Sequence, residues 1–265
     1  MTSLPFFQVD AFASRPFAGN PAAVMPLDRW LDDSLMQSIA AENNLAETAF
    51  LVPRDDDASE GGADYDLRWF TPTVEVDLCG HATLASAHVL MESEHIRFAT
   101  RSGILAVTRK DGLLWLDLPA GTVEQGDEPG LLDALGLPAA IPLFLGRGGN
   151  GAAIALLEDE AAVRSVEPDF RALKAYDRLV MVTAPGDDSA IASRVFASYH
   201  GIDEDPVTGS AHGSLVPFWA ARLGRKRFDA VQASSRGGHL ECEHRGDRVI
   251  LGGTCHTVIV GTFQL

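Results

Sequence analysis

The feature that most constrains the fold is a pattern of glycines and asparagine that occurs once in each half of the chain. In the first half, a Gly19-Asn20 loop precedes a short apolar run, and a glycine-opened helix is expected at Gly80. In the second half, Gly149-Asn150 precedes a similar run, and the corresponding helix is expected at Gly209. The asparagine and the helix glycine are 60 positions apart in the first half and 59 in the second. This near-equal offset indicates two copies of one α+β unit, with chance similarity of glycine-rich loops as the alternative.

The stretch from Leu67 to Leu90 contains the first of these helices and the loop before it. Pro72 marks a turn, because proline fits neither a central strand nor a helix interior. The helix that begins at Cys79-Gly80-His81 is mostly apolar with small residues, a pattern suited to burial. Its start would present free backbone N–H groups and a partial positive charge, which favour a carboxylate ligand. The structural alternative is a glycine turn with a buried cysteine and a capping histidine.

Composition narrows the class of protein. The 265 residues, 46% of them hydrophobic, suffice for one large domain or two of ordinary size. No apolar run approaches the ~18 residues of a membrane span, and Met1–Asp10 lacks the features of a signal peptide, so we expect a cytoplasmic protein. The net charge of −16 argues against nucleic acid and membrane as partners but leaves a small anionic ligand possible. Three scattered cysteines argue against a disulfide framework.

Strands and helices alternate along the chain. One helix is expected over Leu31–Glu42, with Asp32 or Asp33 as its N-cap and Asn43-Asn44 at its end. Strands are expected over Pro5–Phe12, Ala22–Met25, Ala46–Pro53, Leu67–Phe70, Arg97–Asp117 (two strands joined at Lys110-Asp111-Gly112) and Ala152–Leu157. An acidic loop is expected over Asp55–Asp64. Leu118-Pro119-Ala120-Gly121 breaks the pattern, so the predicted domains are 1–118 and 119–255. If both copies are real, the two helix starts are expected to face each other across an interdomain cleft, a favoured place for ligands.

Several motifs suggest chemistry that their context does not support. Gly146–Gly151 fits G-x-G-x-x-G, but a strand rather than a helix is expected after it, which disfavours a dinucleotide site. No nucleophile elbow surrounds Ser210 or Ser214. Cys79, His81 and His88 have no recognised zinc spacing, and His88 is expected to be a hydrogen-bonded core residue. The prediction is therefore no metal and no cofactor.

Four segments in combination resemble the phenazine-biosynthesis PhzF-like family: Gly19–Val24, Asn44–Thr48, Arg68–Thr83 and Glu204–Gly213. The similarity extends over the whole chain, to Gly252-Gly253 and a final strand. It implies an α+β fold with two pseudo-symmetric domains of diaminopimelate epimerase type, each a barrel-like sheet around a central helix. In that fold the last strand, here about 256–265, often returns to the first domain. The resemblance also implies a homodimeric isomerase without a cofactor.

The same resemblance implies roles for individual residues. Glu47 is expected to be the general acid/base, with His81 and Asp205 as further catalytic residues. The residues expected to bind the substrate are Asn20, Cys79, Gly80, Ala82, Thr83, Gly209, Ser210 and Ala211. From the residues alone, Glu47 could instead be a solvated residue at a helix–strand junction, and Asp205 an N-cap.

The sequence departs from related families in ways that affect the predicted reaction. Epimerases of this fold use two thiols, one on each domain. Cys79 stands at the first thiol position, but Pro206 stands at the second in one plausible register. Ala46 beside Glu47 and the segment Gln232–Gly238 also differ from the usual family pattern, which leaves the substrate open. The predicted function is isomerisation of a small, cyclic carboxylate, with a dihydro-hydroxyanthranilate as first candidate. A two-base amino-acid epimerase and a non-catalytic small-molecule binder are the alternatives.

Overall fold

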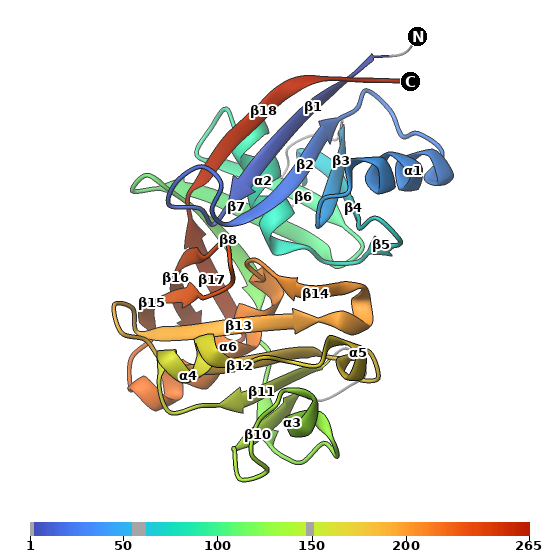
Figure 1. The fold of residues 1–265 in the computed structure, drawn as a ribbon. Helices are drawn as coiled ribbons and strands as arrows, with labels where there is room; N and C mark the ends of the chain where they lie inside the picture. Colours follow the sequence, from blue (N-terminus) through green and yellow to red (C-terminus); the bar gives the residue numbers. More distant parts are fainter. Residues whose placement is uncertain (1–2, 55–61, 147–150) are drawn as a thin grey trace. The chain divides into compact units, whose positions relative to one another are not determined.

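The structure is a computed structural model that describes residues 3–54, 62–146 and 151–265 (Figure 1). The chain divides into two compact units. Unit 1 comprises Met1–Asp117 and Gly252–Leu265, and unit 2 comprises Leu118–Leu251. Within the described ranges, no helix is both long enough and apolar enough to cross a bilayer.

Unit 1 is a mixed sheet packed on a central helix. Its elements in chain order are β1 (Ser3–Ala11), β2 (Asn20–Pro26), α1 (Asp33–Asn43), β3 (Glu47–Pro53), β4 (Tyr65–Phe70), β5 (Glu75–Val76), α2 (Gly80–Leu90), β6 (His95–Thr100), β7 (Gly103–Lys110), β8 (Leu113–Pro119) and β18 (Cys255–Gln264). The strands pair in the order β18–β1–β2–β3–β4–β6–β7–β8, and β5 pairs with β4. The central helix α2 packs against β1, β2 and β3.

Unit 2 has the same construction. Its elements are β9 (Val123–Gln125), α3 (Leu131–Ala134), β10 (Leu143–Gly146), β11 (Ala152–Leu156), α4 (Glu160–Ser165), α5 (Phe170–Leu173), β12 (Leu179–Pro185), β13 (Ile191–Ala197), a 3₁₀ turn (Ser198–His200), β14 (Ile202–Asp205), α6 (Gly209–Leu223), β15 (Arg227–Gln232), β16 (Gly238–Arg245) and β17 (Arg248–Gly253). The paired order begins β9–β10–β11–β12–β13–β15–β16, and β14 pairs with β13.

The directions of the strands show that the chain contains two copies of one unit. From β1 to β7 in unit 1, successive pairings are antiparallel, parallel, antiparallel, parallel and antiparallel. From β10 to β16 in unit 2 the series is the same. In each unit the second parallel connection contains the glycine-opened helix, α2 or α6. The predicted pseudo-symmetric α+β fold is therefore confirmed, as are both helix starts.

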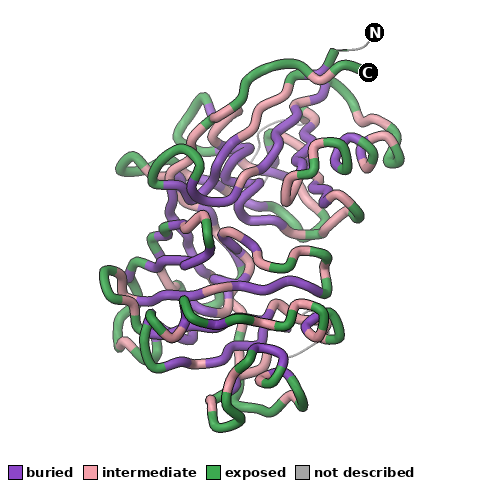
Figure 2. Tube along the Cα trace, viewed as in Figure 1, coloured by how far each residue is buried: buried purple, intermediate pink, exposed green. Residues whose placement is uncertain are grey.

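The central helix of unit 1 is buried because its side chains are small and apolar. Every residue from Gly80 to Ala87 is buried, and Figure 2 shows the buried trace running through the helix. The two hydroxyls in this stretch bond to the carbonyl four residues back, Thr83 to Cys79 and Ser86 to Ala82 (2.7 Å). These bonds satisfy polar groups that burial would otherwise penalise. A second cluster, centred on Met25, Met36 and Phe50, packs α1 against the sheet.

The central helix of unit 2 contains a proline whose missing donor is replaced from outside the helix. Pro217 lies inside α6 and has no N–H, so the carbonyl of Gly213 loses its usual partner four residues on. The backbone N–H of Gly121, in the segment between β8 and β9, donates to that carbonyl at 2.9 Å. This bond fixes the segment against α6. The hydrophobic core of unit 2 contains, among others, Leu131, Leu143, Val163, Val180, Val182 and Phe196.

Local expectations were mostly met. The helix α1 begins at Asp33 after Asp32, which makes no side-chain capping bond, and ends at Asn44 in the left-handed conformation (φ 49°). Glu75 was expected in a loop but belongs to the short strand β5, because Phe70 provides an edge for it to pair with. Residues 55–61 of the acidic loop and 147–150 of the glycine-rich loop lie outside the described residues, so Asn150 cannot be compared with Asn20.

Candidate active site

Three segments of unit 1 bring four of the predicted site residues together. Asn20 is the first residue of β2, Glu47 is the first residue of β3, and Cys79 and His81 flank the start of α2. Because β2 and β3 run parallel, with Ala22 opposite Glu47, Asn20 and Glu47 lie at the same end of the sheet. The N-cap Cys79 makes no capping bond through its side chain, so the helix start keeps backbone donors available.

His81 is the centre of this cluster. Its Nδ1 lies 3.1 Å from the amide nitrogen of Asn20 and 3.5 Å from the sulfur of Cys79. Its Nε2 lies 3.1 Å from Oε2 of Glu47, at ion-pair distance. The imidazole is 3% exposed, so these neighbours, rather than water, determine its protonation. When Nδ1 accepts from Asn20, the ring proton sits on Nε2, beside the carboxylate.

The charges in the cluster follow from burial and proximity. Burial raises the pKa of the Cys79 thiol, and Glu47 raises it further, so the thiol stays protonated at neutral pH. Burial alone would lower the pKa of His81, but Cys79 and Glu47 together raise it well above its usual value. The cluster thus places Glu47 beside an imidazole whose pKa is raised, with an uncharged thiol near the opposite ring nitrogen.

The carboxylate of Glu47 can accept further hydrogen bonds. Its side chain is 12% exposed. Oε2 is buried and lies 3.1 Å from Nε2 of His81, and among the described residues no hydrogen bond of regular geometry reaches it. This oxygen can therefore accept a hydrogen bond from a further group.

The same three side chains do not form a metal-binding set around one point. A donor atom of each of Glu47, Cys79 and His81 lies within 4.8 Å of the others. However, the sulfur faces Nδ1 of the ring and the carboxylate faces Nε2. An ion held by one ring nitrogen would have the other ligand on the far side of the imidazole. The geometry therefore favours proton handling over metal binding.

The remaining predicted residues divide between the two units. Ala82 and Thr83 lie buried in the first turn of α2. In unit 2, Asp205 ends β14, and Gly209, Ser210 and Ala211 form the first turn of α6. Asp205 is 6% exposed, and its carboxylate accepts a hydrogen bond from the hydroxyl of Thr208. The N-cap of α6 is Thr208 rather than Asp205, so the interpretation of Asp205 as an N-cap is wrong.

Sequence reasoning missed the residue that holds this part of unit 2 together, Gln232 at the end of β15. Its side chain is fully buried; it accepts from the backbone N–H of Thr208 at 2.8 Å and donates to the carbonyl of Asp205 at 2.7 Å. It therefore fixes the strand end and the helix start relative to each other. The only available signal was a polar residue at the end of an apolar strand, and its partners lie 24 and 27 residues away.

Another buried histidine, His212, lies one turn into α6. Its Nδ1 lies 2.9 Å from the carbonyl oxygen of Thr208, and its Nε2 makes no hydrogen bond among the described residues. Burial lowers the pKa of His212 to about 4, although the bond to Thr208 opposes the shift. His212 is therefore neutral at physiological pH. His88, expected in the core, is half-buried and lies within hydrogen-bond distance of Thr257 (3.0 Å).

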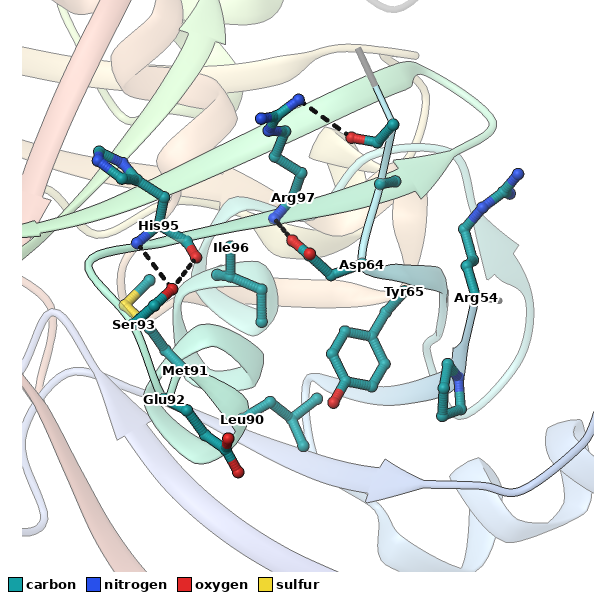
Figure 3. Close-up of a pocket in the computed structure, with 13 residues that line it drawn as sticks. Arg54, Asp64, Tyr65, Leu90, Met91, Glu92, Ser93, His95, Ile96 and Arg97 are labelled. Carbon is teal, nitrogen blue, oxygen red and sulfur yellow. Dashed lines mark hydrogen bonds between the residues drawn. The ribbon is translucent and has the colours of Figure 1, made fainter. Parts of the chain in front are cut away.

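Two cavities lie away from the His81 cluster. One, of about 540 Å³, is lined by residues that include Arg54, Tyr65, Leu90, Glu92 and Arg97, and Figure 3 shows Tyr65 and Leu90 among its lining side chains. It lies at the C-terminal end of α2, roughly 15 Å along the helix axis from the His81 end. The other, of about 360 Å³, lies beside Phe144, Phe218 and Arg222 in unit 2. Neither contains a predicted site residue.

Comparison with known proteins places this chain among the isomerases. A family model described as phenazine biosynthesis-like protein, PhzC-PhzF, matches residues 9–261. A Pseudomonas aeruginosa protein described as an uncharacterized isomerase is 50% identical, with 99% of both chains covered. The crystal structure of a PhzF family protein from Enterococcus faecalis superposes with a TM-score of 0.90 at 45% identity, covering 100% of both chains.

A solved structure with low sequence identity shares the fold of this chain. A hydroxyproline epimerase from Agrobacterium vitis has a TM-score of 0.63 at 14% identity, with 99% of this chain and 91% of that chain covered, which is evidence for a shared fold alone. The fold and the relatives together identify this chain as an isomerase. The chain belongs to the phenazine biosynthesis-like PhzF family.

Proposed function

We propose that this isomerase moves a proton between two carbon atoms of a small, cyclic carboxylate, with Glu47 as the general acid/base. The observation that carries the proposal is the buried Oε2 of Glu47, which has no aligned hydrogen bond among the described residues and lies 3.1 Å from His81. In such a reaction the carboxylate takes a proton from one carbon, and the resulting carboxylic acid returns it to another. The substrate keeps its composition, so neither an oxidant nor a co-substrate is required.

His81 supports this step electrostatically. A cationic imidazole beside Glu47 stabilises negative charge that develops as the proton leaves carbon. Asn20 limits rotation of the ring by contacting the opposite nitrogen. The backbone N–H groups at Gly80 and Ala82 lie at the start of α2, where we expect the substrate carboxylate to bind, and Thr83 lies in the same turn, with its own N–H donating to the carbonyl of Cys79.

The proposed roles of the unit 2 residues come from the family resemblance. Asp205 is expected to contact an amine or hydroxyl of the substrate, and Gly209, Ser210 and Ala211 to supply further polar contacts. The network of Gln232 and Thr208 supports this role, because it orders Asp205 before any ligand arrives. Dihydro-hydroxyanthranilate is the first substrate candidate.

A two-base thiol mechanism is less consistent with the geometry. Cys79 is buried and its thiol is protonated at neutral pH. The other two cysteines, Cys242 and Cys255, lie on strands β16 and β18, and neither is at the start of α6. No second thiol is therefore placed to act with Cys79.

The test is a screen of cyclic amino- and hydroxycarboxylates, including dihydro-hydroxyanthranilate, read first by thermal shift. A compound at 100 times its Kd should stabilise the fold by about 2.7 kcal/mol. Compounds that bind are then incubated with the protein in deuterated buffer and followed by proton NMR. Isomerisation with deuterium at the receiving carbon supports the proposal. Binding with neither isomerisation nor deuterium uptake would identify a small-molecule binder instead.

A further inference from the structure

The cavity of about 360 Å³ in unit 2 is a feature that the proposed function does not use. Its lining comes from the segment that begins at Gly121, from β10 through Phe144, and from the part of α6 between Pro217 and Arg222. The hydrogen bond from Gly121 to the carbonyl of Gly213 fixes the first of these segments against the helix. The volume lies within the ~300–1,000 Å³ of small-molecule sites.

The lining of this cavity is mostly apolar. The apolar side chains that line it are Val123, Phe144, Pro217, Phe218 and Ala221. The rings of Phe144 and Phe218 meet edge to face, with their centres 5.0 Å apart. On β9, Val123 and Gln125 line the cavity and Glu124 between them does not. Because neighbouring residues on a strand point to opposite faces, the carboxylate of Glu124 lies on the other face of β9.

Arg222 is the charged residue among the described residues that line the cavity. The central carbon of its guanidinium lies 3.5 Å from the centre of the Phe218 ring and 4.8 Å from that of Phe144. Its Nη1 donates to the carbonyl of Phe218 at 3.0 Å. Contacts with two rings and a carbonyl hold the guanidinium in place at the apolar lining. Among the described residues, no carboxylate forms an ion pair with Arg222.

An uncompensated guanidinium beside an apolar lining favours an anion with an apolar body. The chain has 37 acidic residues and 21 lysines and arginines, so its cations have many carboxylates to pair with, yet Arg222 pairs with none that is described. A guanidinium has five N–H donors in a planar fork that binds a carboxylate through two parallel hydrogen bonds. A carboxylate conjugated to an aromatic ring is planar with that ring. Such a pair would therefore extend the ring from Arg222 along the apolar lining.

The net charge of the chain indicates the size and charge of this anion. At −16 the protein repels a large or multiply charged anion more strongly than a single carboxylate. We propose that this cavity, the Arg222 cavity, binds a small aromatic monocarboxylate, with its carboxylate on Arg222 and its ring against Phe144 and Phe218. The site is independent of the isomerase chemistry, since none of the proposed catalytic or substrate-binding residues lines it.

The first test compares benzoate with benzamide, which has the same shape and no charge. Methyl NMR of alanine- and valine-labelled protein follows Val123 and Ala221, which line the cavity. Benzoate should shift both methyl signals to saturation, with a Kd at least about tenfold below that of benzamide, because only benzoate forms a charge-assisted pair with Arg222. A carboxylate at the start of α2 would instead shift the methyl signal of Ala82, so binding at the proposed active site is read separately.

The second test removes the charge or fills the cavity. Arg222→Gln should raise the Kd for benzoate, read at Val123, at least about tenfold. Arg171→Gln, at an exposed position on α5 of the same unit, is the matched control and should leave this Kd unchanged. Ala221→Phe keeps the guanidinium but occupies the cavity, and should abolish the saturable shift of Val123. Far-UV circular dichroism of all three variants should match the wild type.

Three results would overturn the proposal. The first is the absence of a saturable shift of Val123 and Ala221 with benzoate. The second is equal Kd values for benzoate and benzamide, which would show that Arg222 contributes no charge to binding. The third is an unchanged Kd for benzoate in Arg222→Gln or in Ala221→Phe. The comparison of benzoate with benzamide uses the wild type and requires no variant to fold.

Discussion

At the scale of single residues, the thiol of Cys79 distinguishes proton transfer by Glu47 from a two-base mechanism. The sulfur is buried and uncharged at neutral pH and lies 3.5 Å from Nδ1 of His81. Cys79→Ser keeps a small group there, so we expect turnover of the substrate to fall less than about tenfold. Removal of a general base typically costs ~10²-fold or more. A loss of that size in the deuterium-uptake assay would favour the thiol mechanism.

His212 predicts a specific dependence of stability on pH. Its folded-state pKa of about 4 lies below the ordinary value of 6.5 because the ring is buried. Between these pH values the unfolded chain binds a proton that the folded chain does not. The contribution of His212 to the free energy of unfolding is therefore fully present above pH 6.5. It decreases by about 3 kcal/mol as the pH falls toward 4.

Urea denaturation at a series of pH values measures this effect. His212→Gln should flatten the decline of unfolding free energy between pH 6.5 and 4, whatever its effect at neutral pH. The same change at the exposed His239 on β16 is the control and should leave the decline as in the wild type. Equal slopes for wild type and His212→Gln would show that His212 already binds a proton in the folded protein.

The contacts among site residues could not be obtained from sequence spacing. The family resemblance implied catalytic roles for Glu47 and His81 and a substrate-binding role for Cys79, and these roles stay predictions. Their placement depends on the parallel pairing of β2 with β3 and on the start of α2, which are long-range features. Gln232 was missed for the same reason, since the chain gives no local sign that it bonds to Thr208 and Asp205.

At the scale of elements, the turn before β2 positions Asn20. Gly19 has a φ of +67°, and a Cβ there would lie 2.2 Å from the carbonyl oxygen of Ala11. Gly19→Ala therefore adds a backbone clash to the strain of a left-handed conformation, and should cost roughly 2–4 kcal/mol of unfolding free energy. Gly112 has a φ of +78° but nothing within 4 Å of such a Cβ.

Gly112→Ala is thus the matched control for Gly19→Ala. It carries only the conformational cost, about 1 kcal/mol. Chemical denaturation of both variants separates the cost of the backbone clash from the cost of the left-handed conformation. If they lose the same stability, the packing of the turn against Ala11 is not what fixes the start of β2.

The elements themselves were largely predictable because their signals are local. Glycine at the helix starts, Asn44 at the end of α1 and Asp111-Gly112 in the β7–β8 turn each act through nearby backbone geometry. The short strand β5 was missed because two residues carry no periodic pattern, and its existence depends on β4 beside it.

At the scale of the whole molecule, the net charge of −16 should destabilise the folded chain at low ionic strength. Salt shortens the screening length from ~30 Å at ~0.01 M to ~10 Å at ~0.1 M. We therefore expect Tm to rise over this range of NaCl in thermal melts followed by circular dichroism. A fall in Tm would show that screening of ion pairs such as Arg68–Glu75 (2.7 Å) outweighs the relief of self-repulsion.

The internal duplication was the strongest whole-chain inference from sequence, and matching strand directions in the two units now support it. The identity of the substrate could not be predicted, because it depends on side chains contributed by distant segments. The proposed isomerase function therefore depends on Glu47, which the fold places beside His81.

Proton NMR of Glu47→Gln in deuterated buffer tests that account most directly. Glutamine keeps the shape of the side chain but cannot accept and return a proton. With dihydro-hydroxyanthranilate, or the carboxylate that the screen identifies, turnover and deuterium uptake should fall by ~10²- to 10⁴-fold while thermal-shift binding persists. Glu92→Gln, at an exposed position beyond the end of α2, is the control and should react like the wild type. Wild-type turnover by Glu47→Gln would contradict the account and place the base on another residue.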